Sequence, residues 1–499
     1  MSAIGRWLDQ RIDLASLRRT LLDRKMPAGL TWWHTLGSAT LTVFVVQVVT
    51  GIVLAMYYSP SPDHAYDSIR YLERTVVSGA TLRGIHHWGA SAMVILVTAH
   101  MIRVFTMGAY KYPREANWVL GVALFALVLA FGFTGYLLPW DQKAYWATQV
   151  GTNIAGTTPV VGQTLVRLLR GGAQLGAATL ARFFALHVLV LPALLAVIVG
   201  LHLAMVVRQG IAARPRVLEA DAPRRTDEPG YVAYYATRSV DAKARGVPFW
   251  PDIIAKDIIV ATGVVALLVV LGIYAGAGLE PPADPNDASY VPRPEWYFLP
   301  FFQLLKLVPG SMESVVAVGI PGLLIVALLL LPFFDRRSTR SFRRRPVAMF
   351  SLGGVTAACA LLFGASARDA PREAPEVGRP LSSVERAGRT LFEQQQCGGC
   401  HKVAGEKAPK KNEDAPEDTP ELTAVGLKHS ASWMHSFIED PVRFHHDSKM
   451  PAFGPPTLSH QEIEELAQYL ASLRGPGGAN KQPEFRDTFP EPVKSKEKP

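Results

Sequence analysis

The chain has 499 residues, of which 49% are hydrophobic and 19% are charged, whereas roughly 25% of residues are charged in soluble proteins. Some stretches run about 20 residues almost without charge, which excludes a single soluble domain. The formal net charge is +9, but the Arg residues lie in short runs between apolar segments, as membrane topology requires, so we expect no nucleic-acid partner. The chain has only three cysteines, two of them in Cys397-Gly-Gly-Cys400-His401, which excludes a disulfide framework and indicates haem attachment.

The hydropathy pattern predicts an all-α membrane protein with seven transmembrane helices, a group of four followed by a group of three. The segments lie near residues 33–57, 84–106, 118–138, 183–207, 254–278, 315–334 and 347–366. Residues 1–30 hold six Lys or Arg residues and no small-residue cleavage pattern, so we expect the first helix to be retained.

The distribution of Lys and Arg between alternate sides predicts the orientation of the chain. These residues concentrate on the side that holds the N-terminus, which places that side in the cytoplasm of a bacterial cell, with the chain in the inner membrane. Because the number of spans is odd, everything after residue 366 then lies outside, where bacteria attach haem to Cys-x-x-Cys-His segments.

The composition along the chain predicts seven regions. They are a cytoplasmic segment (1–30), a four-helix domain (31–210), a cytoplasmic loop (211–250), a three-helix domain (251–366), a linker (367–383), a small helical domain (384–474) with a low-complexity insert at 405–420, and a disordered tail (475–499).

Histidines recur inside two of the apolar segments. His86 and His100 are 14 residues apart and His187 and His202 are 15 apart, so each pair returns within about 40–60° of one helix face over about 21 Å. A lone histidine in a membrane helix is more often a satisfied polar contact, but two helices that each offer such a pair predict two bis-histidine b-type haems stacked across the membrane. His87 is not needed for this arrangement.

Glycines provide a separate test of the two haem depths. Gly37 and Gly51 in the first span, and Gly121 and Gly135 in the third, are again 14 apart. Glycine is common in membrane helices, but small residues also let a flat macrocycle approach a backbone. We define the inner level by Gly37, His100, Gly121 and His202, and the outer level by Gly51, His86, Gly135 and His187.

Arginines near the membrane faces are candidates to pair with haem propionates. Arg83, Arg103 and Arg182 lie within five residues of the predicted ligands. Ordinary interfacial anchoring is the alternative explanation for all three.

Four segments together resemble the cytochrome b subunit of quinol:cytochrome c reductases, the cytochrome bc complexes. They are LRGIHHWGASAMVILVTAHMIRVF (82–105), GFTGYLLPWDQKAYWA (132–147), RFFALHVLVLPALLAVIVGLH (182–202) and RPEWYFLPFFQLLKLVP (293–309). The likeness covers residues 20–366 and is greater to the photosynthetic branch. That branch often carries a cysteine where this chain has Thr35, so an additional covalent haem in the membrane is not expected.

The tetrapeptide Pro294-Glu295-Trp296-Tyr297 resembles the outer quinol-oxidation motif of this family. The resemblance implies that Glu295 accepts a proton from quinol and that Tyr297 helps shape the pocket. By composition alone, the same residues are consistent with an interfacial aromatic belt.

On the cytoplasmic side, Lys256 and Asp257 resemble the quinone-reduction site, with Asp257 as a proton donor. A charge pair at the start of a helix is the alternative reading. The mitochondrial pattern has a histidine where this chain has Val207, followed by Arg208, which we keep as a further cofactor-binding candidate.

The C-terminal domain is expected to hold one covalent c-type haem through Cys397 and Cys400, with His401 as an iron ligand. Residues 449–451 and 458–473 resemble the ligand loop and closing helix of class I cytochromes c, which favours Met450 as the sixth ligand. Met434, His435, His445 and His446 are the alternatives.

Together these features predict a respiratory or photosynthetic enzyme subunit in which a cytochrome b is fused to a cytochrome c. The resemblance implies that quinol is oxidised outside, that one electron leaves through a Rieske iron–sulfur protein and the other through the two b haems to quinone, and that protons are translocated. The expected partners are that Rieske protein, membrane lipid and quinone, and a second copy of the complex.

Several alternatives stay open at this point. A further cytochrome c subunit can intervene, and the acceptor can be a soluble or membrane-bound cytochrome c or a terminal oxidase. A di-haem membrane anchor that relays electrons to another redox enzyme is the rival function, and a transporter with incidental histidines is the non-redox rival.

Overall fold

The computed structural model describes residues 3–172, 174–213, 215, 222–283, 285, 292–368, 381–403, 419–475 and 487. It divides into two compact units, Met1–Ala367 and Arg368–Pro499. The predicted insert lies almost entirely outside the described residues, as do most of the linker and of the tail.

The prediction of an all-α membrane protein is confirmed, because seven helices of the described chain are long and apolar enough to cross a bilayer. Three of them include a short π-helical turn. The seven spans are α3 (Leu36–Tyr57), α5 (Gly79–Thr106), α6 (Glu115–Tyr136), α9–η2–α10 (Ala177–Ala185, Leu186–Val190, Leu191–Gln209), η4–α12 (Phe249–Ile253, Ile254–Tyr274), η7–α14 (Val315–Gly319, Ile320–Phe334) and α15 (Pro346–Arg368).

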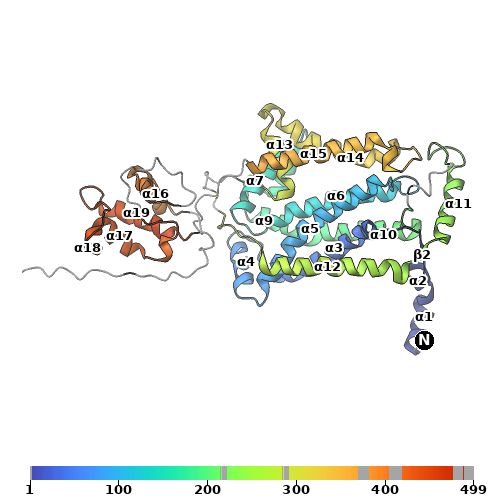
Figure 1. The fold of residues 1–499 in the computed structure, drawn as a ribbon, viewed down its shortest axis with the longest axis horizontal. Coiled ribbons are helices and arrows are strands. Elements are labelled where there is room, and N and C mark those ends of the chain that lie inside the picture. The colour runs from blue at the N-terminus through green and yellow to red at the C-terminus, as the bar shows by residue number, and fades with distance from the viewer. Residues whose placement is uncertain are drawn as a thin grey trace, which may run out of the picture. The chain divides into compact units, whose positions relative to one another are not determined.

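Short elements connect the spans at both ends (Figure 1). At one end lie α4 (Ala65–Arg74), α7 (Gln142–Gly156), α8 (Gly162–Arg170), η5 (Trp296–Phe298), α13 (Leu299–Lys306) and η6 (Gly310–Met312). At the other end lie α1 (Ala3–Ile12), α2 (Leu14–Leu21), η1 (Trp32–Thr35), α11 (Tyr231–Ala244), η8 (Phe342–Arg344) and the antiparallel pair β1 (Lys25–Met26) and β2 (Val247–Pro248).

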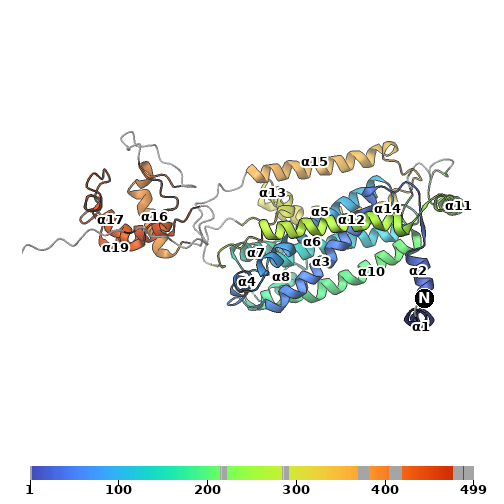
Figure 2. The ribbon, with the colours of Figure 1, turned by 60° about the horizontal axis from the view of Figure 1, so that its bottom comes forward.

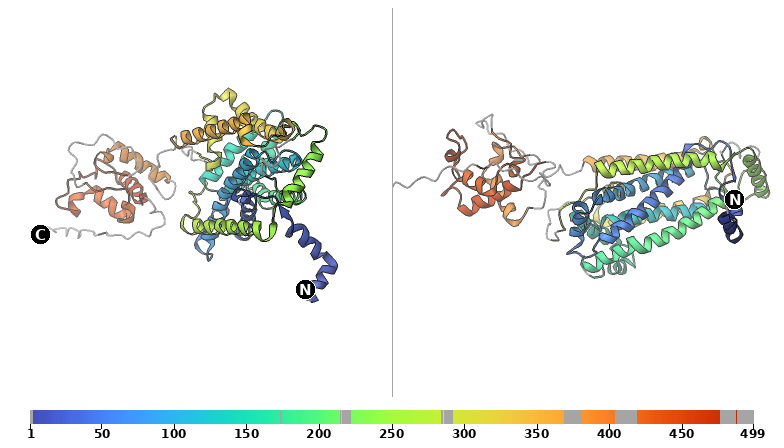
Figure 3. Two further views of the ribbon diagram at one scale, coloured as in Figure 1. Left: turned by 45° about the vertical axis from the view of Figure 1, so that its right-hand side comes forward. Right: turned by 90° about the horizontal axis from the view of Figure 1, so that it is seen from below.

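The long helices run side by side (Figure 3). Helix α5 packs against α3 and α12, and α6 packs against α10 and α14. The crossing of α5 and α12 requires Gly84, because a Cβ atom there would lie 2.7 Å from the carbonyl oxygen of Gly272. In Figure 2, α15 lies along the side of this bundle.

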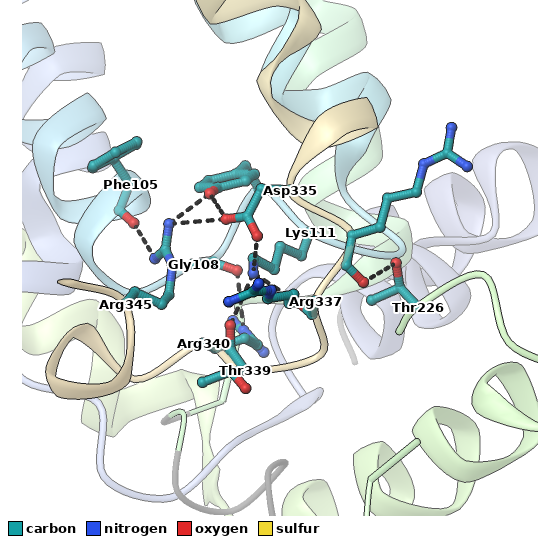
Figure 4. A network of polar contacts seen from close by, with 11 residues as sticks. Phe105, Gly108, Lys111, Thr226, Asp335, Arg337, Thr339, Arg340 and Arg345 are labelled. Carbon is teal, nitrogen blue, oxygen red and sulfur yellow. Dashed lines mark hydrogen bonds and ion pairs between the residues drawn. The ribbon is translucent and has the colours of Figure 1, made fainter. Parts of the chain in front are cut away.

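A buried polar network joins the α5–α6 connection to the end of α14 and the start of α15 (Figure 4). Nζ of Lys111 donates to Oδ1 of Asp335 at 2.8 Å and to the carbonyl oxygens of Arg337 and Thr339. Tyr110 and Arg345 donate to Oδ2 of Asp335. Burial alone would raise the pKa of Asp335, but these donors outweigh it and hold the pKa below its usual value.

The C-terminal unit is a small helical domain made of α16 (Ser383–Gln394), η9 (Cys397–Gly399), η10 (Val425–Leu427), α17 (Ala431–Glu439), α18 (Pro441–Phe444) and α19 (His460–Ser472). Ser382 and Ser459 cap α16 and α19 in capping boxes that define where each helix begins. Helices α16 and α19 cross closely at Gly388 and bury Phe392 against Tyr469.

Candidate functional site

Each predicted glycine lies against a histidine of its own level. A Cβ atom added at Gly51 would lie 3.2 Å from Cε1 of His86, and one at Gly135 would lie 2.6 Å from Cε1 of His187. At the inner level, the same test gives 3.2 Å between Gly37 and His100 and 3.8 Å between Gly121 and His202. Helices α3, α5, α6 and the α9–α10 span therefore converge at the two depths defined from the sequence.

The outer pair has the separation that an axially ligated iron requires. The ring centroids of His86 and His187 are 6.4 Å apart. Two imidazoles bound to opposite sides of one metal ion, with bonds of about 2 Å, place their centroids about 6 Å apart. The residues present thus fit a haem between α5 and the α9–α10 span.

A π-helical turn explains the unequal histidine spacing. Residues Leu186–Val190 form this turn, with the amide of Leu191 donating to the carbonyl oxygen of Leu186. A π turn inserts one extra residue into a helix. The 15-residue step from His187 to His202 is therefore equivalent to the 14-residue step of α5, and the rotation of about 60° expected from the sequence does not arise.

Threonine hydroxyls hold both outer histidines. Oγ1 of Thr50 lies 2.8 Å from Nδ1 of His86, and Oγ1 of Thr134 lies 2.9 Å from Nδ1 of His187. Each hydroxyl already donates its hydrogen to a backbone carbonyl one turn earlier. Each threonine must therefore accept from Nδ1, which leaves Nε2 of each ring available for a metal.

The three candidate arginines differ in what they contact. Arg83 pairs with Glu73 and donates to the carbonyl oxygens of Ala277 and Gly278. Arg182 donates to the carbonyl oxygens of Arg167 and Leu168. Within the described part of the chain, Nε and Nη2 of Arg103 are buried without a hydrogen-bond partner, which fits an anionic group such as a propionate.

The PEWY segment packs beside the outer level. Nε1 of Trp296 donates to Oγ of Ser91 on α5 at 3.1 Å. The Tyr297 ring fills the space over Gly132 on α6, where a Cβ atom would lie 2.8 Å from the phenolic oxygen. Burial raises the pKa of Tyr297, so its hydroxyl is neutral at physiological pH. Pro294 precedes Glu295, the N-cap residue of η5.

Glu295 is held by a lysine that the sequence analysis did not select. Nζ of Lys143 on α7 donates to Oε1 of Glu295 at 2.6 Å, and both side chains are mostly buried. His87, which the histidine arrangement did not need, lies within electrostatic range of both groups. A lysine inside the aromatic segment WDQKAYW was the signal available in the sequence.

At the inner level, Asp257 on α12 accepts a hydrogen bond of 2.6 Å from Oγ of Ser38. Ser38 follows Gly37, so this carboxylate lies one residue along α3 from the inner level. Nζ of Lys256 donates to the carbonyl oxygen of Leu30 at 3.4 Å, and Arg208 is exposed at the end of α10.

In the C-terminal unit, the CGGCH segment begins with η9, and Cys400 and His401 follow directly after it. Nδ1 of His401 lies 2.9 Å from the carbonyl oxygen of Pro420, a contact that leaves Nε2 available for iron. Cys397 and Met450 both pack against the domain core, and burial raises the pKa of the Cys397 thiol to about 11. Cys400 is exposed.

Three families match the chain, each over a separate range. Residues 21–210 match the family described as cytochrome b/b6/petB, and residues 282–380 match cytochrome b(C-terminal)/b6/petD. Residues 385–474 match cytochrome c.

Relatives and one solved structure agree with these matches. The chain is 34% identical to the cytochrome bc complex cytochrome b subunit of Chlorobaculum thiosulfatiphilum, over 72% of this chain and 79% of that protein. It is 44% identical to the menaquinol:cytochrome c reductase cytochrome b subunit of Geobacillus thermodenitrificans, over 41% of this chain and 96% of that protein. A hyperthermophilic respiratory complex III chain is similar in fold, with a TM-score of 0.62, 29% identity, and coverage of 72% and 91%.

Proposed function

We propose a quinol-oxidising function for this chain, which belongs to the cytochrome b family of the cytochrome bc complexes and carries a cytochrome c domain. In this proposal quinol is oxidised beside Glu295, and quinone is reduced beside Asp257. The observation that carries this proposal is the position of the PEWY segment. Trp296 contacts Ser91 on α5, within two turns of His86, and Tyr297 contacts Gly132 on α6, one turn from Gly135 of the outer level. A quinol bound there lies next to an electron acceptor.

We assign the outer haem to His86 and His187, the inner haem to His100 and His202, and the covalent haem to Cys397, Cys400, His401 and Met450. Haem held there supplies a carrier of single electrons. The four-helix arrangement of histidines opposite glycines supports this assignment, since each macrocycle needs two ligands and two gaps. Arg103 is our candidate for an inner propionate.

Oxidation of quinol to quinone releases two electrons and two protons, so the site needs a base. Glu295 is partly buried and pairs with Lys143, and its carboxylate is our candidate to take a proton from the quinol hydroxyl. The neutral hydroxyl of Tyr297 lies against α6 and shapes the same pocket. Release of both protons on this side, the first through Glu295, and proton uptake beside Asp257 translocate charge across the membrane.

A second electron route requires a partner. The chain has only three cysteines, so the iron–sulfur protein of a Rieske type must be a separate subunit. The C-terminal unit is our candidate acceptor from that protein, because attachment to the last span gives it a high effective concentration there. We further propose a dimeric complex in the bacterial inner membrane, with the N-terminus in the cytoplasm.

Glu295→Gln tests the proton step in membranes that contain the whole complex. Since general base catalysis contributes about 10²–10⁴-fold, we expect quinol-dependent cytochrome c reduction to fall at least about 100-fold. Haem content, measured as pyridine haemochromes, should stay at two b haems for each c haem. Glu313→Gln, at an exposed position, is the matched control.

Two outcomes contradict the proposal. Retention of near wild-type turnover in Glu295→Gln excludes this carboxylate as the base. A ratio other than two b haems to one c haem in the wild-type chain excludes the assigned ligand pairs.

A further inference from the structure

Two facing helices of the C-terminal unit each carry a histidine and a glutamate four residues apart. They are His435 and Glu439 on α17, and His460 and Glu464 on α19. Residues at this spacing share one helix face, so each helix presents its pair together. We propose that His435, Glu439 and His460 bind a divalent transition-metal ion such as Zn²⁺, with Glu464 orienting His435.

The four side chains are cross-paired between the helices. Nδ1 of His435 lies 3.1 Å from Oε2 of Glu464, and Nδ1 of His460 lies 3.7 Å from Oε1 of Glu439. The imidazole rings of His435 and His460 are almost parallel, with an interplanar angle of 7° and centroids 6.0 Å apart. Two nitrogens and one carboxylate oxygen, one from each of His435, Glu439 and His460, lie within 4.8 Å of one another.

One of these distances, between His460 and Glu439, is close to that of an assembled site. Two ligands of a tetrahedral ion with bonds of about 2.0–2.1 Å are separated by about 3.3 Å. The 3.7 Å contact between His460 and Glu439 is near this value. The side chain of His460 is 69% exposed and that of Glu439 is 37% exposed, so both have room to move from a spread of up to 4.8 Å toward this separation.

The donor set determines the class of ion. Two imidazoles and one carboxylate suit Zn²⁺ and its neighbours among the transition metals, and three protein ligands leave one position for water. Glu464 accepts from Nδ1–H of His435, the arrangement that fixes the tautomer and directs Nε2 to a metal. His435, an alternative haem ligand in the sequence analysis, is thus engaged in a different cluster.

The helices that carry these residues form the core of the domain. Helix α17 contributes Met434 and Ile438 to the core, and α19 contributes Ile463 and Leu466. Ser459 caps α19 directly before His460 and fixes the first turn. An ion held by both helices would therefore clamp α17 to α19 and stabilise the folded haem domain.

Titration of the purified, haem-loaded full chain with Zn²⁺, after removal of metals by a chelator, tests the proposal. Isothermal titration calorimetry should give one Zn²⁺ per chain, and Zn²⁺ should raise the melting temperature of the C-terminal unit. We expect His460→Ala to weaken binding by more than about 100-fold and Glu464→Gln by about 10–100-fold. His64→Ala and Glu465→Gln, outside the cluster, are the matched controls.

His460 is exposed, so its replacement tests the ligand without disturbing the core, and an unchanged c-haem spectrum verifies the fold. Three outcomes overturn the proposal. They are the absence of stoichiometric Zn²⁺ binding by the wild-type chain, wild-type affinity in His460→Ala, and an equal loss of affinity in His64→Ala.

Discussion

The outer and inner levels hold their histidines in different ways. At the outer level, Thr50 and Thr134 each accept a hydrogen bond from a histidine, and both glycines approach the rings to within 3.2 Å or less of a hypothetical methyl group. At the inner level, Nδ1 of His202 has no hydrogen bond of ordinary geometry within the described residues, although the backbone carbonyl of Asn117 interacts with this ring. The chain itself therefore orients both outer rings through side-chain hydrogen bonds, whereas His202 has no such side-chain contact among the described residues.

Glycine replacement should have the largest effect and should separate the two levels. Gly135→Ala places a methyl group 2.6 Å from Cε1 of His187, which is too close, so the imidazole ring must move away. Gly121→Ala, in contrast, gives an ordinary contact of 3.8 Å with His202. We expect Gly135→Ala to remove the outer haem and Gly121→Ala to retain both b haems. Pyridine haemochrome analysis and redox-poised spectra measure this, and equal haem loss in the two variants would contradict the comparison.

The two levels were predictable from the sequence because residues 14 apart on a helix return to nearly the same face, so each helix repeats its pattern at two depths. His86, His100, Gly37 and Gly51 could be identified by that period alone, and the seven spans by hydropathy. Helix ends were less certain, since the fourth span begins at Ala177 and the fifth ends at Tyr274.

Long-range pairs could not be predicted in the same way. Lys143 and Glu295 are 152 residues apart, and nothing local to either residue specifies the other. The π turn at Leu186–Val190 also has no simple sequence signal beyond the 15-residue step. The cluster on α17 and α19 likewise depends on how two helices pack, which a period within one helix does not determine.

The two ends of the helix bundle also differ in their polar contacts, since Lys111 at one end is buried and Lys306 at the other end is exposed. Removal of the buried cation tests its contribution to stability. Lys111 is 2% exposed and has three acceptors near the inner level. Lys111→Met leaves Asp335 without its main partner, so we expect a loss of about 3–5 kcal/mol, seen as a lower melting temperature with b-haem absorption as the probe. Lys306→Met, in an exposed side chain at the other end, should have little effect.

The same network predicts an acid limit for this end of the bundle. The pKa of Asp335 is lower in the folded chain, so its contribution to stability is present above its unfolded pKa and is lost as the pH falls through the folded value. The wild-type chain should therefore lose more stability than Lys111→Met when the pH is lowered below about 4. An equal loss in both would show that Asp335 does not depend on Lys111.

The smallest expected effect concerns the hydrogen bond to an outer histidine. Thr134→Val keeps the shape of the side chain but removes the acceptor for Nδ1–H of His187, which makes this ring a weaker donor to iron. A less basic ligand stabilises the oxidised iron less, so the outer haem should be easier to reduce. We expect its redox equilibrium constant to change by up to about tenfold, or 59 mV for one electron, with no change at the inner haem.

Redox titration resolves the two b haems, and a shift confined to the inner haem would reverse the assignment of levels. Thr134→Ser, which retains the hydroxyl, should restore the wild-type potential and so separates the hydrogen bond from packing around α6.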